Sequence, residues 1–324
     1  MLRKEQPRQP DDELTLKLRA AARKRRPLTI RGVLMALMFL LVPAGLFVWW
    51  VYPRPEPGRL EIVAFDQLAL PEAQVTLRAS LATVEPQVPQ VRLDGYPVFF
   101  EDAAPQAGKE KQSVKAISQD GAAAAAWRLP PDQPVVEFLA RYPGDKRRRP
   151  ASDGAHIFMR PVATPLLVVD VRHTLTTVGD AGWRKMNILD IPAVAEAGKA
   201  LEEAQKKMKH QVVYLATHAE DPLAYRKARG WVEDRISSQD PFPAGPVLTR
   251  GSFSQEESAA RQEILRHLKE RFSGPITAVV GQGEAAAVSL AVGVHTILIG
   301  DGEAPAEVIR LATWAEVANH LEMK

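Results

Sequence analysis

The sequence predicts three parts in order: an N-terminal transmembrane helix, a small β-sandwich, and an α/β domain built on a doubly wound parallel sheet. Three patterns indicate them: one long run without charges, then short alternating strands, then continuous apolar runs separated by amphipathic helices. The expected boundaries are a basic cytoplasmic tail at 1–32, a transmembrane helix at 33–52, a Pro-rich spacer at 53–58, the sandwich at 59–160 and the α/β domain at 161–324.

The predicted membrane span reads VLMALMFLLVPAGLFVWWVY, from Val33 to Tyr52, without a charged residue. A helix of this length extends about 30 Å, the thickness of the hydrocarbon core of a bilayer. Trp49 and Trp50 lie near its end, where aromatic rings prefer the headgroup layer. A cleaved signal peptide would have a shorter apolar core followed by a small-residue cleavage site, so we expect an uncleaved anchor.

The charges divide unevenly along the chain. Residues 1–31 hold ten Lys or Arg against four acidic residues, which leaves 32 basic and 35 acidic residues for the remainder. This asymmetry predicts a single-pass protein of the inner or plasma membrane, with a cytoplasmic N-terminus, extracytoplasmic (periplasmic) domains and the lipid membrane as a partner. Because the high pI belongs to the tail, no nucleic-acid partner is expected. The absence of cysteine excludes disulfides, zinc–thiolate sites and cysteine nucleophiles.

Residues 59–160 contain short alternating segments punctuated by Gly and Pro, a pattern typical of an antiparallel sandwich. Beyond them the runs LLVVDV (166–171), QVVYLAT (211–217), ITAVVG (276–281) and HTILIG (295–300) are apolar throughout, as strands buried on both faces must be. Predicted helices separate these runs, at about 191–209, 221–236, 255–272, 284–292 and 313–322. In such sheets the functional site lies at the carboxyl ends of the strands.

Asp170, in VVDVRHTLT, follows the first buried strand directly. It is either a capping aspartate of the next turn or an aspartyl nucleophile that forms a phosphoenzyme beside Mg²⁺. With this strand order, the sequence resembles the haloacid dehalogenase superfamily, whose first motif reads DxDxT. Asp170, Arg172 and Thr174 occupy its three fixed places, and Thr217 corresponds to the Ser or Thr of the second motif.

The resemblance extends over about residues 164–300. The fourth motif, GDxxxD or GNxxxD, corresponds to Gly281, Gln282 and Ala286, while Arg261 stands in the place of the third-motif lysine by its distance before the strand. FPAGPVLTRGSF (242–253) and AAAVSLAVGVHTILIG (285–300) are similar to the lipin and phosphatidate-phosphatase branch. The stretch at 113–144 is similar to bacterial immunoglobulin-like or carboxypeptidase-regulatory-like modules.

Departures from the motifs predict a degenerate site. Arg172 replaces the aspartate that serves as general acid and base, and an arginine cannot give up its proton in a protein. Magnesium requires oxygen ligands with one or two carboxylates; Gln282 offers a neutral oxygen and Glu284 lies two positions from the expected place. Arg172 would favour a bound phosphate dianion.

Two other patterns give weaker hypotheses. Gly281-x-Gly283-x-x-Ala286 matches a dinucleotide-binding fingerprint, or else a plain tight turn between a strand and a helix. His173 and His218 follow strand ends and could act as metal ligands or as an acid and base, or be ordinary loop residues. The sequence contains neither a GxSxG elbow nor a P-loop motif.

We therefore expect a membrane-anchored pseudo-phosphatase that binds either a phosphate-bearing ligand, with a phosphatidate-type headgroup as the leading candidate, or a protein partner. The expected binding residues are Arg172, Thr174, Thr217, Gly281, Gln282, Gly283 and Arg261. No cofactor is expected. The alternative is an active phosphohydrolase with Asp170 as nucleophile, assisted by Thr217, and with Mg²⁺ held by Asp170, Gln282 and Glu284. A third hypothesis is a protein-interaction module without a ligand.

Overall fold

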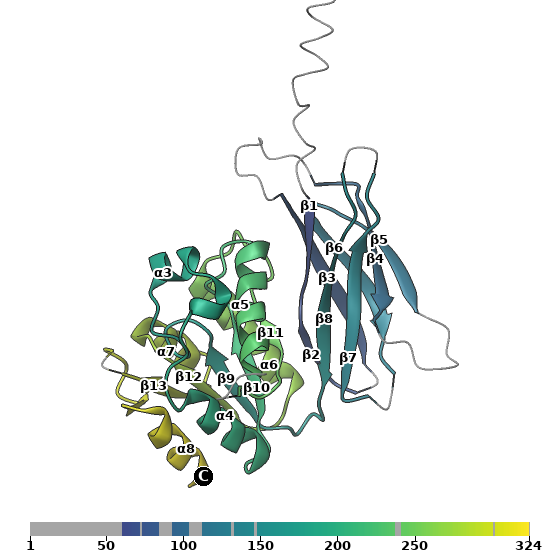
Figure 1. Cartoon of the computed structure of the whole chain (residues 1–324). Helices are drawn as coiled ribbons and strands as arrows, with labels where there is room; N and C mark the ends of the chain where they lie inside the picture. Colours follow the sequence, from purple (N-terminus) through teal and green to yellow (C-terminus); the bar gives the residue numbers. More distant parts are fainter. Residues whose placement is uncertain are drawn as a thin grey trace, which may run out of the picture. The chain divides into compact units, whose positions relative to one another are not determined.

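The computed structural model describes residues 60–71, 73–83, 93–103, 112–130, 133–145, 148–236, 241–300 and 302–323. All of them belong to one compact unit, Pro57–Lys324. The unit contains two β-sheets that share a core and a third sheet covered by helices (Figure 1).

The prediction of an N-terminal transmembrane helix needs correction. Within the described ranges, no helix is both long enough and apolar enough to cross a membrane. The two longest helices, α5 (Pro222–Ile236) and α6 (Glu257–Arg271), have 15 residues each and carry several charges. Each extends only about 22 Å, short of the roughly 30 Å of a bilayer core. The predicted span at 33–52, the tail and the spacer lie outside the described residues. The structure therefore does not support the predicted single-pass architecture or membrane location. The lipid partner stays a prediction.

Two sheets form the sandwich. One has the order β1–β3–β6, with β1 at Leu60–Ala64, β3 at Gln74–Thr83 and β6 at Ala122–Arg128. The other has the order β2–β8–β7–β4–β5, with β2 at Gln67–Ala69, β8 at Ala151–Met159, β7 at Val135–Tyr142, β4 at Pro97–Asp102 and β5 at Ser113–Ile117. The pairs are antiparallel except β2 with β8, which are parallel, so the expected purely antiparallel sandwich was wrong at that edge.

Strand β6 shows how burial outweighs intrinsic propensity. Its sequence, AAAAAWR, is rich in alanine, the best helix former. Exposed and buried residues nevertheless alternate along it, and Trp127 is fully enclosed in the sandwich core. The alternation of period two, with a tryptophan on the inner face, is the pattern of a half-buried strand.

The third sheet has six strands in the order β11–β10–β9–β12–β13–β14, and every neighbouring pair is parallel. The strands are β9 (Leu166–Asp170), β10 (Gln211–Leu215), β11 (Val247–Leu248), β12 (Ile276–Val280), β13 (His295–Ile299) and β14 (Ile309–Leu311). Strands β9, β10 and β12 are buried at every residue, which confirms the parallel sheet predicted from their apolar runs.

Helices cover both faces of this sheet. Residues of α4 (Ala197–Lys206), α5 and α8 (Trp314–Glu322) pack in one core with Leu167 and Val169 of β9. Residues of α6 pack in another with Leu166 and Val168, and α7 (Gly283–Ala291) packs beside α6. Successive side chains of a strand point to opposite faces, so Asp170 lies on the α6 face.

Some elements differ from the expected ones. The helix predicted at 191–209 begins only at Ala197, because Pro192 interrupts the pattern and Glu196 adopts a left-handed conformation with φ of 65°. A short 3₁₀ turn (η1, Ile188–Asp190) and helix α3 (Asp180–Lys185) precede it. Strands β11 and β14 have two and three residues, too few to give a periodic signal.

A buried polar joint connects the sandwich with the α/β part. Arg229 of α5 donates to the carbonyl oxygen of Ala64 at 2.6 Å and to both carboxylate oxygens of Asp153 at 2.9 Å. Asp66 accepts hydrogen bonds from the backbone N–H groups of His156 and Val247 at 2.9 and 3.1 Å. Since these groups are buried, each depends on its partner across the joint.

Candidate functional site

The carboxyl ends of β9, β10 and β12 meet at one edge of the sheet, as the parallel order requires. The backbone at Gly281, after β12, passes so close to the turn after β9 that an added Cβ would lie 1.9 Å from the carbonyl oxygen of His173. Only glycine fits there. His173 itself has φ of 66°, a left-handed conformation that is uncommon for residues other than glycine. The parallel order thus brings Asp170, Thr217 and Gly281 to the same edge of the sheet.

Asp170 is held by an arginine of α6. Arg261 Nη2 donates a hydrogen bond to Asp170 Oδ2 at 2.7 Å, and Arg261 Nη1 lies 2.7 Å from Oδ1 in electrostatic contact. Both residues are buried, with 7% of Asp170 and 3% of Arg261 exposed. Burial raises the pKa of Asp170, and the charge of Arg261 is the main opposing influence. The position expected to carry the third-motif cation thus places its charge directly on the candidate nucleophile.

Arg172 contacts two carboxylates rather than standing free. Its Nη1 lies 3.0 Å from Asp180 Oδ1, and its Nη2 lies 3.7 Å from Glu257 Oε2. Glu257 also accepts a hydrogen bond from the hydroxyl group of Thr217 at 3.2 Å. Glu257 therefore links the turn after β9 to the end of β10.

Three contributors were missed from the sequence: Asp180, Glu257 and Arg250. Arg250 donates to the carbonyl oxygens of Thr217 and Gln255, the latter at 2.6 Å. It follows the two-residue strand β11, which has no apolar run to reveal it, and the two carboxylates begin helices far apart in sequence. Only their position in the fold brings them to the strand ends.

His218, directly after Thr217, is 7% exposed and packs edge-on against Trp183 with ring centroids 5.5 Å apart. Burial, together with the nearby charges of Arg172, Arg250 and Arg261, lowers its pKa to about 3. The imidazole is therefore neutral at ordinary pH. Three arginines (Arg172, Arg250 and Arg261) and three carboxylates (Asp170, Asp180 and Glu257) lie at or beside these strand ends.

The folded protein should lose stability in acid because of His218. Its folded pKa of about 3 lies below its ordinary value of 6.5, so the unfolded state binds the proton more readily between these limits. The contribution is complete above pH 6.5 and is lost as the pH falls, by up to about 1.4 kcal/mol per pH unit. Urea unfolding of His218→Gln between pH 7 and pH 4 should show a shallower acid slope than the parent.

His156→Gln is the matched comparison. Its hydrogen bond to Asp66 raises the pKa of His156, so that histidine stabilises the fold at low pH and not at high pH. Replacing His156 should therefore make the loss of folding stability in acid steeper, the opposite of the effect of His218→Gln. An acid slope unaltered by His218→Gln would contradict the neutral, buried imidazole.

Of the remaining predicted site residues, Thr174 is buried, whereas Gln282 and Glu284 are exposed. Thr174 is buried beside Gly281, and its carbonyl oxygen accepts from the indole N–H of Trp314 at 3.2 Å. Gln282 and Glu284 are exposed, at the N-cap and in the first turn of α7.

In the described ranges, no three His, Asp or Glu side chains lie together so as to hold a metal ion. Both oxygens of Asp170 face Arg261, so Asp170, Gln282 and Glu284 do not form a magnesium shell as placed.

Four buried polar atoms of the site residues at these strand ends have no hydrogen-bond partner among the described residues: Asp170 Oδ1, Arg172 Nε, Thr174 Oγ1 and His218 Nε2. Asp170 Oδ1 has only its ion-pair contact with Arg261 Nη1. Leaving a buried polar atom unpaired costs about 1–3 kcal/mol. The cluster is therefore incomplete as a purely structural network.

No protein-family model and no curated protein matches the sequence. Among solved structures, the D,D-heptose 1,7-bisphosphate phosphatase from B. bronchiseptica, in complex with magnesium and phosphate, is 12% identical, with a TM-score of 0.40, and the match covers 49% of this chain and 98% of that one. A glycosyl hydrolase family 2 member from Bacteroides cellulosilyticus DSM 14838 is 13% identical, with a TM-score of 0.30 and coverages of 72% and 38%. With TM-scores below 0.5, neither likeness decides the family or the function.

Proposed function

We propose that the strand-end cluster binds a phosphate-bearing ligand and does not hydrolyse it. The observation that carries this proposal is the pair between Asp170 and Arg261. A nucleophilic carboxylate needs a free oxygen to attack phosphorus, whereas both oxygens of Asp170 face the guanidinium of Arg261. Arg172 also stands where a general acid and base would be needed, and it can perform neither role.

The charges and unpaired atoms of the cluster support anion binding. Arg172, Arg250 and Arg261 surround His218, and guanidinium groups match the oxygens of phosphate in geometry. The contact of Arg172 with Asp180 is partly exposed, and exposed ion pairs contribute only about 0–1 kcal/mol. A phosphate dianion can therefore displace Asp180 and accept hydrogen bonds from Arg172 Nε and the hydroxyl of Thr174, which are otherwise unpaired.

Inorganic phosphate should bind the full-length chain in a titration calorimeter, and Arg172→Ala should weaken binding roughly 10- to 100-fold. A hydrogen bond to a charged group contributes about 1.5–3 kcal/mol, and the variant also leaves Asp180 and Glu257 without their cation. Arg184→Ala is the control, since Arg184 is an exposed arginine that pairs with Glu220. Asp170→Asn should leave binding level or raise it, because the change releases Arg261 for the ligand.

A hydrolysis assay is the second test of this proposal. With p-nitrophenyl phosphate, the parent protein should show no Mg²⁺-dependent turnover under conditions where phosphate binds. Turnover that Asp170→Asn abolishes would instead establish an active phosphohydrolase. Failure of phosphate to bind at all would favour the protein-interaction module.

A further inference from the structure

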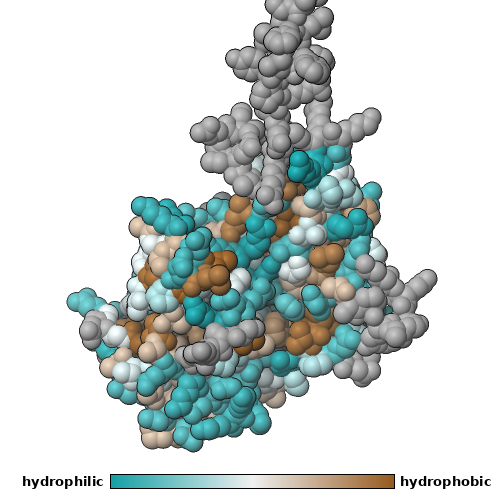
Figure 2. Space-filling model, viewed as in Figure 1, coloured by the Kyte–Doolittle hydropathy of each residue, from teal (hydrophilic) through white to brown (hydrophobic). Residues whose placement is uncertain are grey.

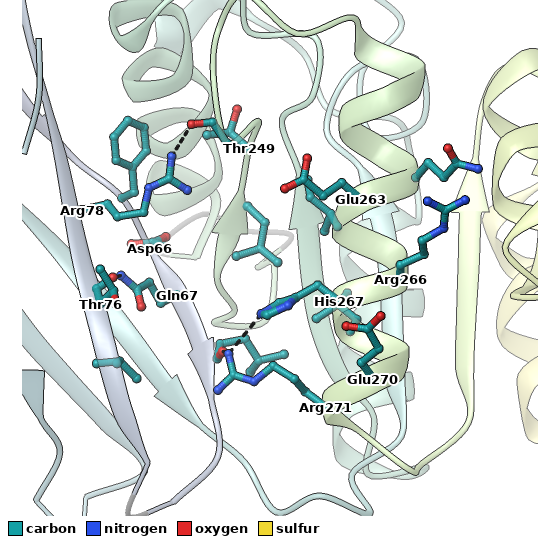
Figure 3. Close-up of a pocket in the computed structure, with 18 of the residues that line it drawn as sticks. Asp66, Gln67, Thr76, Arg78, Thr249, Glu263, Arg266, His267, Glu270 and Arg271 are labelled. Carbon is teal, nitrogen blue, oxygen red and sulfur yellow. Dashed lines mark hydrogen bonds between the residues drawn. The ribbon is translucent and has the colours of Figure 1, made fainter. Parts of the chain in front are cut away.

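A cavity of about 850 Å³ lies between the sandwich and helix α6, and neither Asp170 nor Arg261 lines it. Its volume falls in the range of about 300–1,000 Å³ that is usual for small-molecule sites. Figure 3 shows its two walls: Gln67, Thr76 and Arg78 on the sandwich side, and Glu263, Arg266, His267, Glu270 and Arg271 along α6. We call this cavity the β3–α6 groove.

Strand β3 provides its polar wall through simple alternation. Val75 and Leu77 point into the sandwich core, so Gln74, Thr76 and Arg78 point outward. Apolar side chains of Phe65, Leu68, Leu248 and Ile264 also line the groove. Amide, hydroxyl and apolar groups in one cavity are typical of a site for an organic molecule with several hydrogen-bonding groups.

Arg78 gives the groove its chemical preference. Its guanidinium donates to the carbonyl oxygen of Gly251 and lies 5.6 Å from the centre of the Phe65 ring. Burial lowers its pKa, and Glu263 is the strongest opposing charge. In the part of the chain that the structure describes, no carboxylate reaches ion-pair distance of Arg78. Arg78 is half-buried on the groove wall and has no carboxylate of the described residues at ion-pair distance, so its guanidinium is placed to pair with an anionic group of a ligand.

The other charges of the groove limit that anion. The lining carries three acidic residues (Asp66, Glu263 and Glu270) and three arginines (Arg78, Arg266 and Arg271), so it has no excess of positive charge to hold a dianion. A carboxylate, with a single charge and two oxygens, suits the guanidinium fork better here than a phosphate dianion does. Amides of Gln74 and Gln262 and the hydroxyl of Thr76 are placed to bond hydroxyl groups.

We propose that the β3–α6 groove is a second binding site that takes a small carboxylate bearing several hydroxyl groups, of the sugar-acid class. Its carboxylate pairs with Arg78, and its hydroxyl groups bond the glutamine and threonine side chains on both walls. The site has a different lining from the strand-end cluster, which is expected to take phosphate.

Galacturonate and galactose are suitable probes, because they differ only in a carboxylate against a hydroxymethyl group. In ¹⁵N–¹H spectra of the full-length chain, galacturonate should give saturable shifts at residues of β3 and α6, and galactose should bind at least tenfold more weakly. Arg78→Gln should weaken galacturonate binding roughly 10- to 100-fold, since it removes a charged hydrogen-bond donor.

Arg310→Gln is the matched control, because Arg310 also donates to a backbone carbonyl, that of Ala304, but from β14 outside the groove. It should leave binding unchanged. Gln262→Glu is a second variant in case Arg78→Gln fails to fold. It keeps the shape of the side chain and adds a negative charge to the groove, so it should weaken the binding of galacturonate several-fold more than that of galactose. Absence of saturable shifts, shifts confined to the strand ends, or sensitivity to Arg172→Ala instead of Arg78→Gln would overturn the proposal.

Discussion

Replacing Arg261 with methionine should lower the free energy of unfolding by about 3–5 kcal/mol, the usual loss when one partner of a buried ion pair is removed. The reason is that Asp170 would keep its buried charge without a counter-ion or would have to take up a proton. Urea unfolding monitored by tryptophan fluorescence measures the difference. It should shrink as the pH is lowered, because a protonated Asp170 no longer needs Arg261.

The double variant Asp170→Leu, Arg261→Met separates the contribution of the ion pair to stability from the contribution of side-chain packing. With both charges removed and the volume roughly kept, most of the lost stability should return, since a buried ion pair stabilises little compared with an apolar replacement. Arg184→Met, which breaks an exposed pair with Glu220, should cost no more than about 1 kcal/mol. A loss below about 1 kcal/mol for Arg261→Met would mean that the pair is not desolvated as described, and would remove the main support for a blocked nucleophile.

The second large effect concerns the joint between the sandwich and the α/β part. Arg229→Met should destabilise the protein by about 3–5 kcal/mol, because Asp153 and the carbonyl oxygen of Ala64 lose their buried donor together. Thermal unfolding followed by circular dichroism provides the measurement.

Arg226→Met, on the same helix, is the control. Arg226 pairs with Glu61 across the same joint but is 39% exposed in its side chain, against 5% for Arg229. Its loss should therefore cost only about 0–1 kcal/mol. Similar effects of the two variants would show that burial does not distinguish these contacts.

The sequence predicts the strand-end site well where a local pattern carries the information. The apolar run LLVVD places Asp170 at the end of a buried strand, and the parallel order then brings Thr217 and Gly281 to the same edge. Arg261 was found only from its distance before β12, and nothing local indicated that it would face Asp170.

Other features have no local signal at all. Asp180 and Glu257 read as ordinary first-turn acids of helices, and the contact of both with Arg172 depends on how distant segments fold. The β3–α6 groove joins residues almost 200 positions apart, and Arg229 reads as a charge on the solvent side of a helix. Periodicity reports which face of an element is apolar, but not which distant element it meets.

On the face drawn in Figure 2, small hydrophobic patches alternate with hydrophilic ones over the described residues, which is the usual surface of a folded domain.

The segment 249–257 contributes residues to both proposed sites. Thr249, Gly251 and Gln255 line the β3–α6 groove, while Arg250 and Glu257 bond Thr217 at the strand ends. A ligand that shifts this segment at one site should therefore alter the contacts available at the other. Thermodynamic linkage then requires reciprocity: whatever factor galacturonate imposes on the dissociation constant of phosphate, phosphate must impose on that of galacturonate. Titration of each compound in the presence of the other measures this factor twice, and the two values must agree.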